Sequence, residues 1–184
     1  MCCTWNECMD NSSGGLEQTQ PEGLQKKYVK VGIGQMAAAG RETVLKTTGL
    51  GSCVGVILYD GKGAAGMIHI MLPEVHTAVH GCVNRWKYAD PAVDDLVAHL
   101  IDKGCCPGNL KAKIAGGAHM LSVKVRSRLI RIGERNVRAV KHRLSSHGIP
   151  VIAEDTGGRN GRSILFNVET SQMIIKTGGG ELQL

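Results

Sequence analysis

Residues 52–72 read SCVGVILYDGKGAAGMIHIML, two apolar runs joined by the glycine-rich segment DGKG. Short runs rich in Val and Ile on either side of such a turn segment are typical of an antiparallel β-hairpin. If the loop is the three residues 60–62, Cys53 lies directly opposite His69 on one face of the hairpin, with Cβ atoms ~4.5–5.5 Å apart. A slip of one residue would place the two side chains on opposite faces. The hairpin therefore predicts a sheet and, on it, a thiol beside an imidazole.

Further β-rich segments precede and follow this hairpin, each bounded by glycine, proline or polar residues. The expected strands are residues 28–36, 42–47, 110–118, 149–155, 162–169 and 172–177. No internal repeat is visible. The chain is therefore expected to be dominated by β-sheet on both sides of the hairpin.

Two segments have apolar residues at helical spacing. In the first, Asp90 is expected to be the N-cap, Pro91 suits the first helical position, and Gly104 marks the end. The second is expected to run from about residue 133 to 147. Strands followed by helix, strand, helix and strands predict a mixed α/β domain with a substantial antiparallel component.

The ends and the composition bound the class of protein. Residues 1–25 are polar and aperiodic and are expected to form a mobile tail, which leaves residues 26–184 as a single domain. No run of about 18 apolar residues occurs, so we expect no membrane insertion. The N-terminus lacks the basic start and apolar centre of a secretory signal, which favours the cytoplasm.

The formal net charge is +6, which allows an acidic partner. Aromatic residues make up only 3% of the chain, leaving few surfaces on which bases could stack, so nucleic acid is not an expected partner. The basic stretch from Lys124 to Arg143 is either a solvated helix face or a docking surface for an acidic protein.

Seven cysteines are present, an odd number that favours free thiols in a reducing compartment. Cys2, Cys3 and Cys8 lie close together and could bind a metal, although neither a second C-x-x-C pair nor a histidine pair at zinc spacing completes the set. A zinc or thiol-redox role for this segment therefore remains an alternative.

The segment TTGLGSC, residues 47–53, places a thiol directly after a flexible turn. A thiolate that attacks a carbonyl carbon needs a base to accept its proton, and His69 is the histidine that the hairpin brings near. Thr47 or Thr48 could orient the ring, and backbone N–H groups at Ser52 and Cys53 could bind an oxyanion. The alternative is that Cys53 is a small buried apolar residue and His69 a hydrogen-bonded core residue.

Seven motifs in order resemble the chemoreceptor glutamine deamidase family, CheD. They are LGSCVGVILYD, GMIHIMLPE, KYADPAVDDLV, KAKIAGGAHML, IGERNVRAVKHRL, IPVIAEDTGGRNGRSILFNVETSQMII and GGGE, between about Val29 and Glu181. The resemblance implies a layered sandwich with mixed sheets inside and helices outside, similar to the catalytic domain of cytotoxic necrotizing factor toxins. It also implies that Cys53 is the nucleophile, His69 the general base and Thr47, rather than Thr48, the third member of the site.

The activity that this resemblance implies is hydrolysis of glutamine side chains on the cytoplasmic helices of methyl-accepting chemoreceptors, without metal, nucleotide or flavin. The phosphatase CheC is an implied partner, and a non-catalytic adaptor that binds receptors or CheC is the competing interpretation. The chain departs from the family pattern at VHTAVHGCVNRW, residues 75–86, where His76 or His80 could compete as base. His119 stands where a small residue is expected.

Overall fold

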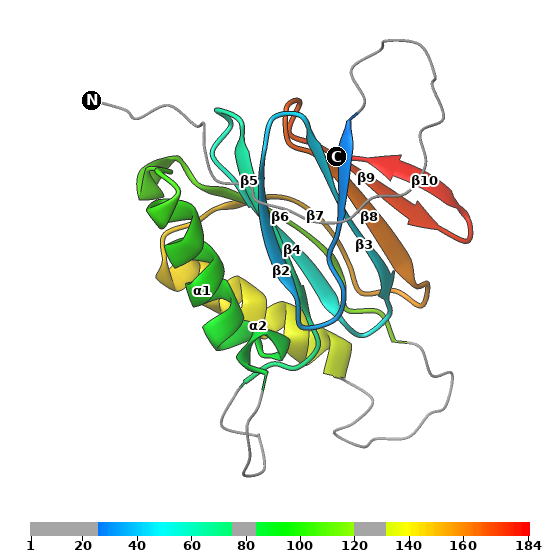
Figure 1. Cartoon of the computed structure of the whole chain (residues 1–184). Helices are drawn as coiled ribbons and strands as arrows, with labels where there is room; N and C mark the ends of the chain where they lie inside the picture. The colour runs from blue at the N-terminus through cyan, green and yellow to red at the C-terminus, as the bar shows by residue number, and fades with distance from the viewer. Residues whose placement is uncertain (1–25, 75–83, 120–131) are drawn as a thin grey trace, which may run out of the picture.

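Two five-stranded sheets lie face to face, and two helices cover the outer face of one of them (Figure 1). This computed structural model describes residues 26–74, 84–119 and 132–184. The first sheet contains, in spatial order, β1 (Lys27–Lys30), β3 (Thr43–Leu50), β8 (Arg162–Asn167), β9 (Gln172–Thr177) and β10 (Gly180–Gln183). The second contains β2 (Met36–Gly40), β5 (Ala64–Ile70), β4 (Val54–Tyr59), β6 (Lys111–Gly116) and β7 (Val151–Thr156).

The sheets are mixed and largely antiparallel, which confirms the expected fold class. Within the described residues, β1 and β3 pair in parallel, as do β6 and β7, and the other pairs are antiparallel. The helices are α1 (Ala89–Asp102) and α2 (Ile132–Ser146), and short 3-10 turns span Arg85–Lys87 and Pro107–Asn109. Both α-helices pack on the sheet that contains β4, so the layers run helix, sheet, sheet (Figure 1).

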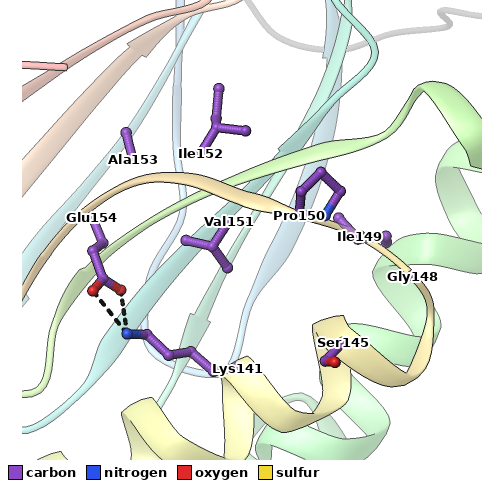
Figure 2. Close-up of a pocket in the computed structure, with 9 residues that line it drawn as sticks. All are labelled: Lys141, Ser145, Gly148, Ile149, Pro150, Val151, Ile152, Ala153 and Glu154. Atoms are coloured by element: carbon purple, nitrogen blue, oxygen red, sulfur yellow. Dashed lines mark hydrogen bonds and ion pairs between the residues drawn. The ribbon is translucent and has the colours of Figure 1, made fainter.

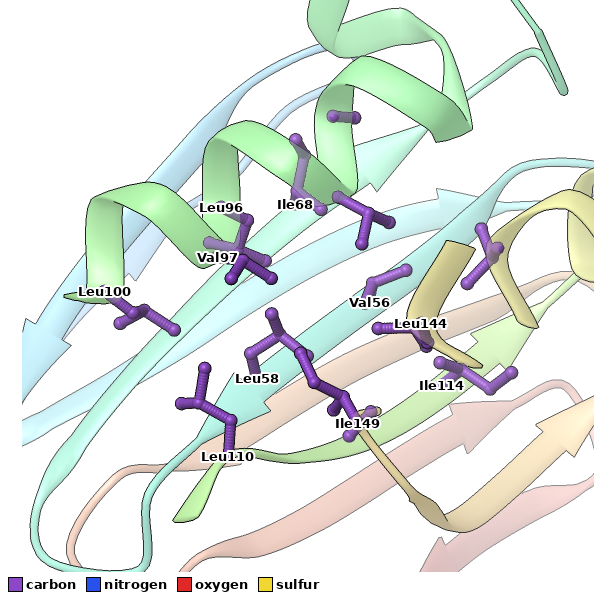
Figure 3. Close-up of a cluster of buried hydrophobic side chains, with 14 of the residues drawn as sticks. Val56, Leu58, Ile68, Leu96, Val97, Leu100, Leu110, Ile114, Leu144 and Ile149 are labelled. Atoms are coloured by element: carbon purple, nitrogen blue, oxygen red, sulfur yellow. The ribbon is translucent and has the colours of Figure 1, made fainter. Parts of the chain in front are cut away.

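Two apolar layers hold this arrangement together. One lies between the helices and the second sheet, where Leu96, Leu144 and Ile114 are among the buried side chains (Figure 3). The other lies between the sheets and includes Ile57 and Phe166. Strands β4 and β5 are buried on both faces because they lie between the two layers, whereas β8 alternates between buried and half-buried residues.

The helix boundaries agree with the expectation except at one end. Asp90 was expected to be the N-cap, but α1 begins at Ala89 with Tyr88 at the cap, so Asp90 lies inside the first turn. A carboxylate there still complements the positive end of the helix dipole. The second helix lies within one residue of its expected bounds at each end.

The hairpin has a longer loop than expected, so the predicted pairing of Cys53 with His69 is wrong. Gly55 lies opposite His69, two residues from the expected register. The reason is the side chain of Asp60, whose Oδ1 accepts hydrogen bonds from the N–H groups of Lys62 and Ala64 at 2.8 and 3.1 Å. Gly61 and Gly63, on either side of Lys62, adopt the positive φ angles that this wider turn needs. A shift of two residues, unlike a shift of one, leaves every side chain on its expected face.

Two features at the edges of the sheets were not predicted. Residues 28–36 divide between β1 and β2, which belong to different sheets, and β10 adds an edge strand after β9. The expected tail, residues 1–25, lies outside the described residues. No helix in the described part of the chain is long and apolar enough to cross a membrane.

Candidate active site

Thr47 and His69 meet between the two sheets. Thr47 is on β3 of one sheet and His69 on β5 of the other, and Thr47 Oγ1 lies 2.8 Å from His69 Nδ1. Both residues are fully buried. Thr48, the alternative considered from the sequence, is exposed because its side chain points to the opposite face of β3. The structure thus places Thr47, not Thr48, against the imidazole.

The second ring nitrogen of His69, Nε2, is not engaged by the described residues. Among the residues that the structure describes, Nε2 is buried and has no hydrogen-bond partner. A buried N–H without an acceptor is rarer in folded proteins than an acceptor without a donor. This favours the tautomer in which Nδ1–H donates to Thr47 Oγ1 and Nε2 carries a lone pair. Burial lowers the pKa of His69 to about 4, so the ring is neutral near pH 7 and can accept a proton at Nε2.

Cys53 lies on the same side of its sheet as His69. It packs in the apolar layer between the sheets and is only 9% exposed. Gly55 is the direct partner of His69, and Cys53 lies two residues before Gly55, immediately before β4 begins. The thiol makes no hydrogen bond to Nε2 in this conformation. Burial raises the pKa of the Cys53 thiol, so the sulfur is protonated at neutral pH.

Gly55 lets side chains of the first sheet pack closely against β4. A Cβ added there would lie 2.7 Å from Ile164 Cδ1, 3.1 Å from Leu50 Cδ1 and 3.4 Å from Thr47 Cγ2. Contacts of this kind would force neighbouring side chains to move. The absence of a side chain at position 55 therefore allows the second sheet to approach Thr47 closely enough for the bond to His69.

Hydrogen bonds from the segment after β6 to two backbone carbonyl groups hold the loop that contains Cys53. Gly51 O accepts from Ala118 N–H at 2.7 Å, and Cys53 O accepts from Gly117 N–H at 2.8 Å. Gly116 allows this close approach, because a Cβ there would lie 2.2 Å from Cys53 O. The N–H groups of Ser52 and Cys53 take part in none of the hydrogen bonds among the described residues. No partner from the described residues therefore occupies these two donors beside the thiol.

Asn136 is a member of the site that the sequence analysis did not identify. It is fully buried on α2, and its Nδ2 donates to Ser52 O and to Met71 O, each at 2.9 Å. A polar residue in line with the buried helix positions Gly133, Val140 and Leu144 is the signal that could have revealed it.

Arg162 is a second residue missed from the sequence. Its guanidinium binds Asp155 through two nitrogens, at 2.7 and 2.9 Å, and donates to the carbonyls of Gly157 and Asn160. Arg162 also pairs with Leu50 at the end of β3, so this cluster braces the turn between β7 and β8 next to the Cys53 loop. A bidentate carboxylate pair at a 7% exposed arginine is a rigid attachment.

Other histidine and cysteine residues lie on or directly after the helices, and His119 follows β6. His99 and His142 are on α1 and α2, and Cys105 and Cys106 follow α1. His119 is half-buried, and its backbone N–H donates a hydrogen bond to Gly158 O. Several candidates lie outside the described residues. They are the alternative bases, the cysteines near the N-terminus and the first part of the basic stretch, namely His76, His80, Cys2, Cys3, Cys8 and residues 124–131.

Three basic residues in the described part of the stretch, Arg138, Lys141 and Arg143, form ion pairs. Arg143 and His147 both contact Asp94, which ties α2 to α1. Lys141 pairs with Glu154 on β7, across a cavity of about 660 Å³ (Figure 2). The side chains and backbone around this cavity come from α2, β7 and the turn between them, so it lies away from Cys53, His69 and Thr47.

Comparisons with known proteins identify close relatives. The family model described as "CheD chemotactic sensory transduction" matches residues 71–177. The chain is 49% identical over 157 residues to a "Probable chemoreceptor glutamine deamidase CheD" of Geobacillus kaustophilus, covering 84% of this chain and 95% of that protein. It is 47% and 45% identical over 150 residues to proteins named "Chemoreceptor glutamine deamidase CheD" in Bacillus velezensis and Bacillus subtilis, covering 81% of this chain and 90% of each relative.

Proposed function

The chain belongs to the CheD family, and we propose that it is a chemoreceptor glutamine deamidase that converts glutamine side chains to glutamate with release of ammonia. The observation that carries the proposal is the bond between Thr47 and His69, which leaves the buried Nε2 without a partner among the described residues, on the face of the sheet where Cys53 packs. The catalytic roles of these three residues are part of the proposal.

In the first half of the reaction, the Cys53 proton passes to His69 Nε2 and Sγ attacks the side-chain amide carbon of the substrate glutamine. The carbonyl oxygen becomes an oxyanion that the N–H groups of Ser52 and Cys53 can bind. The imidazolium then protonates the amide nitrogen, the C–N bond breaks, and ammonia leaves a thioester behind.

In the second half, a water molecule gives one proton to Nε2 as its oxygen attacks the thioester carbon. The C–S bond breaks, the imidazolium returns its proton to sulfur, and glutamate is released. The sum of the two halves is consumption of one water for each ammonia formed. His69 thus alternates between base and acid, and Thr47 keeps its Nδ1 proton in place throughout.

Both reacting groups are neutral in the free protein, which suits general-base catalysis rather than a preformed ion pair. Burial raises the pKa of Cys53 and lowers that of His69, so neither group carries charge before a substrate is bound. Because thiol and imidazole are not yet hydrogen-bonded, proton transfer requires the two side chains to approach each other as the substrate amide enters.

The proposed partners follow from the family. Methyl-accepting chemoreceptors supply the substrate glutamines on their cytoplasmic helices, the phosphatase CheC binds the enzyme, and the enzyme works in the cytoplasm as one deamidase domain over residues 26–184. Neither nucleic acid nor a bound cofactor has a part in the proposed reaction. A non-catalytic adaptor is the second candidate, favoured by the protonated thiol and the missing thiol–imidazole bond.

Mass spectrometry of a receptor cytoplasmic fragment incubated with the chain separates the two candidates. We expect a gain of about one dalton at specific glutamines with the wild-type chain, and no gain with Cys53→Ala or His69→Gln at equal fragment binding. Conversion that persists with Cys53→Ala would overturn the proposed nucleophile. Binding without conversion by the wild-type chain would favour the adaptor.

A further inference from the structure

We infer that Asn136 is the positioning residue for the oxyanion donor at Cys53, because its side-chain amide fixes the orientation of the Ser52–Cys53 peptide. The inference rests on the proposed function, since it assigns a part in the same reaction to a residue on α2. It concerns a residue that touches neither the sulfur nor the imidazole.

The geometry of a trans peptide connects the two groups. In a planar trans peptide, the N–H of one residue points opposite to the C=O of the residue before it. Asn136 Nδ2 holds Ser52 O at 2.9 Å, so the Cys53 N–H must point away from Asn136. Helix α2 covers the outer face of the second sheet, and away from it lies the space between the sheets, where the Cys53 side chain packs (Figure 1).

A hydrogen bond to the preceding peptide orients the second proposed donor, the Ser52 N–H, in the same way. Ala118 N–H holds Gly51 O at 2.7 Å, which directs the Ser52 N–H. Gly133 on α2 fits against this segment so closely that a Cβ there would lie 2.5 Å from Gly117 O. The first turns of α2 therefore support both peptides of the loop, one through backbone packing and the other through the Asn136 side chain.

Asn136 also ties the Cys53 loop to the strand that carries His69. The second hydrogen of the same amide is donated to Met71 O, two residues after His69. Asn136 Oδ1, by contrast, is buried and has no partner among the described residues. The side chain is thus used as a double donor to two carbonyl groups, and a residue of similar shape without donors would release both.

Asn136→Leu tests the inference, with Val140→Ala as the matched control. Leucine resembles asparagine in shape but donates nothing, and Val140 is a buried residue one turn further along α2 that packs in the helix-facing layer. Turnover of a receptor cytoplasmic fragment and alkylation of Cys53 by iodoacetamide at pH 8.5 are measured for each variant. Alkylation needs the thiolate but develops no oxyanion.

For Asn136→Leu we expect kcat to fall about 10- to 100-fold, because loss of one oxyanion donor costs roughly 100- to 1,000-fold and here the donor is displaced rather than removed. KM and the alkylation rate should stay within about 3-fold of wild type. Should Asn136→Leu fail to fold, Asn136→Ser retains one donor and should give a smaller loss of kcat. A kcat equal to that of Val140→Ala, or an alkylation rate that falls in parallel with kcat, would overturn the inference.

Failure of the proposed function would be seen in proteins other than Asn136→Leu, as absence of deamidation by the wild-type chain or deamidation that persists in Cys53→Ala. The amide resonance of Cys53 in ¹⁵N-labelled protein gives a readout that does not depend on turnover. It should shift in Asn136→Leu and stay in place in Val140→Ala, and a Cys53 amide unmoved by the loss of Asn136 contradicts the positioning role even if no deamidation occurs.

Discussion

Thr47 Oγ1 and His69 Nδ1 lie 2.8 Å apart in the buried space between two sheets, one residue from each sheet. The orientation of the imidazole is therefore set by how the sheets pack, not by the hairpin that carries it. Changes in the layer between the sheets should reach the imidazole, whereas changes to the apolar side chains of the helix-facing layer should not. The first two predictions follow from this relationship.

Thr47→Val should impair catalysis and stability together. Valine has nearly the same shape but leaves His69 Nδ1 buried without a partner, which costs about 1–3 kcal/mol of unfolding free energy. We expect kcat to fall at least about 10-fold because the ring loses its preferred tautomer. Thr48→Val, at the exposed neighbour, is the control for urea denaturation and turnover. Equal effects of the two substitutions would contradict the assignment.

Gly55→Ala should reduce turnover more than a glycine-to-alanine substitution that causes similar crowding on the helix-facing side of the same sheet. The new Cβ would press on Ile164 and Leu50 and would touch the Thr47 methyl group, with a cost of about 1–3 kcal/mol.

Gly66→Ala is the control for this prediction, because its Cβ would lie 2.6 Å from Leu96 Cδ1, in the helix-facing layer. We expect similar losses of melting temperature for both glycine variants, but a large loss of turnover only for Gly55→Ala. Parallel losses of turnover would show that the site does not depend on the space at position 55.

The stability of the fold should decrease as the pH falls from 6.5 toward 4. The pKa of His69 is about 4 in the folded chain and 6.5 when unfolded, so within this window the unfolded chain binds more protons. The contribution is on the order of 3 kcal/mol, fully present above pH 6.5 and lost near pH 4. Urea denaturation of wild type and His69→Gln across the window isolates it. An NMR titration of the His69 ring with a midpoint near 6.5 would refute the prediction.

Cys53 should react slowly with iodoacetamide in the free protein. Burial raises its pKa, so alkylation at pH 7.5 should be slower than at the exposed Cys106 and should increase with pH beyond 9. Peptide mapping of the alkylated protein measures both sites in one sample. Fast labelling of Cys53 well below pH 8 would mean that the thiol is activated before substrate binds.

The local elements could be predicted from the sequence because their signals are local. Apolar spacing placed α2 within one residue at each end, and the alternation in residues 52–72 placed Cys53 and His69 on one face of a hairpin. The hairpin register could not be predicted, because it depends on two hydrogen bonds to the Asp60 carboxylate. The observed register differs from the predicted one by two residues. Because this is an even number, Cys53 and His69 still lie on the same face of the sheet.

The sequence by itself determined which reactive residue types are present. It also determined on which face of its strand or helix each of them lies, because side-chain direction follows the periods of strand and helix. Tertiary structure alone brought Thr47 into contact with His69, because these two residues belong to strands of different sheets. It also decided that Asn136, more than 80 residues after the thiol, holds the peptide beside it. Contacts between distant segments depend on how whole layers pack, and no local pattern encodes that packing.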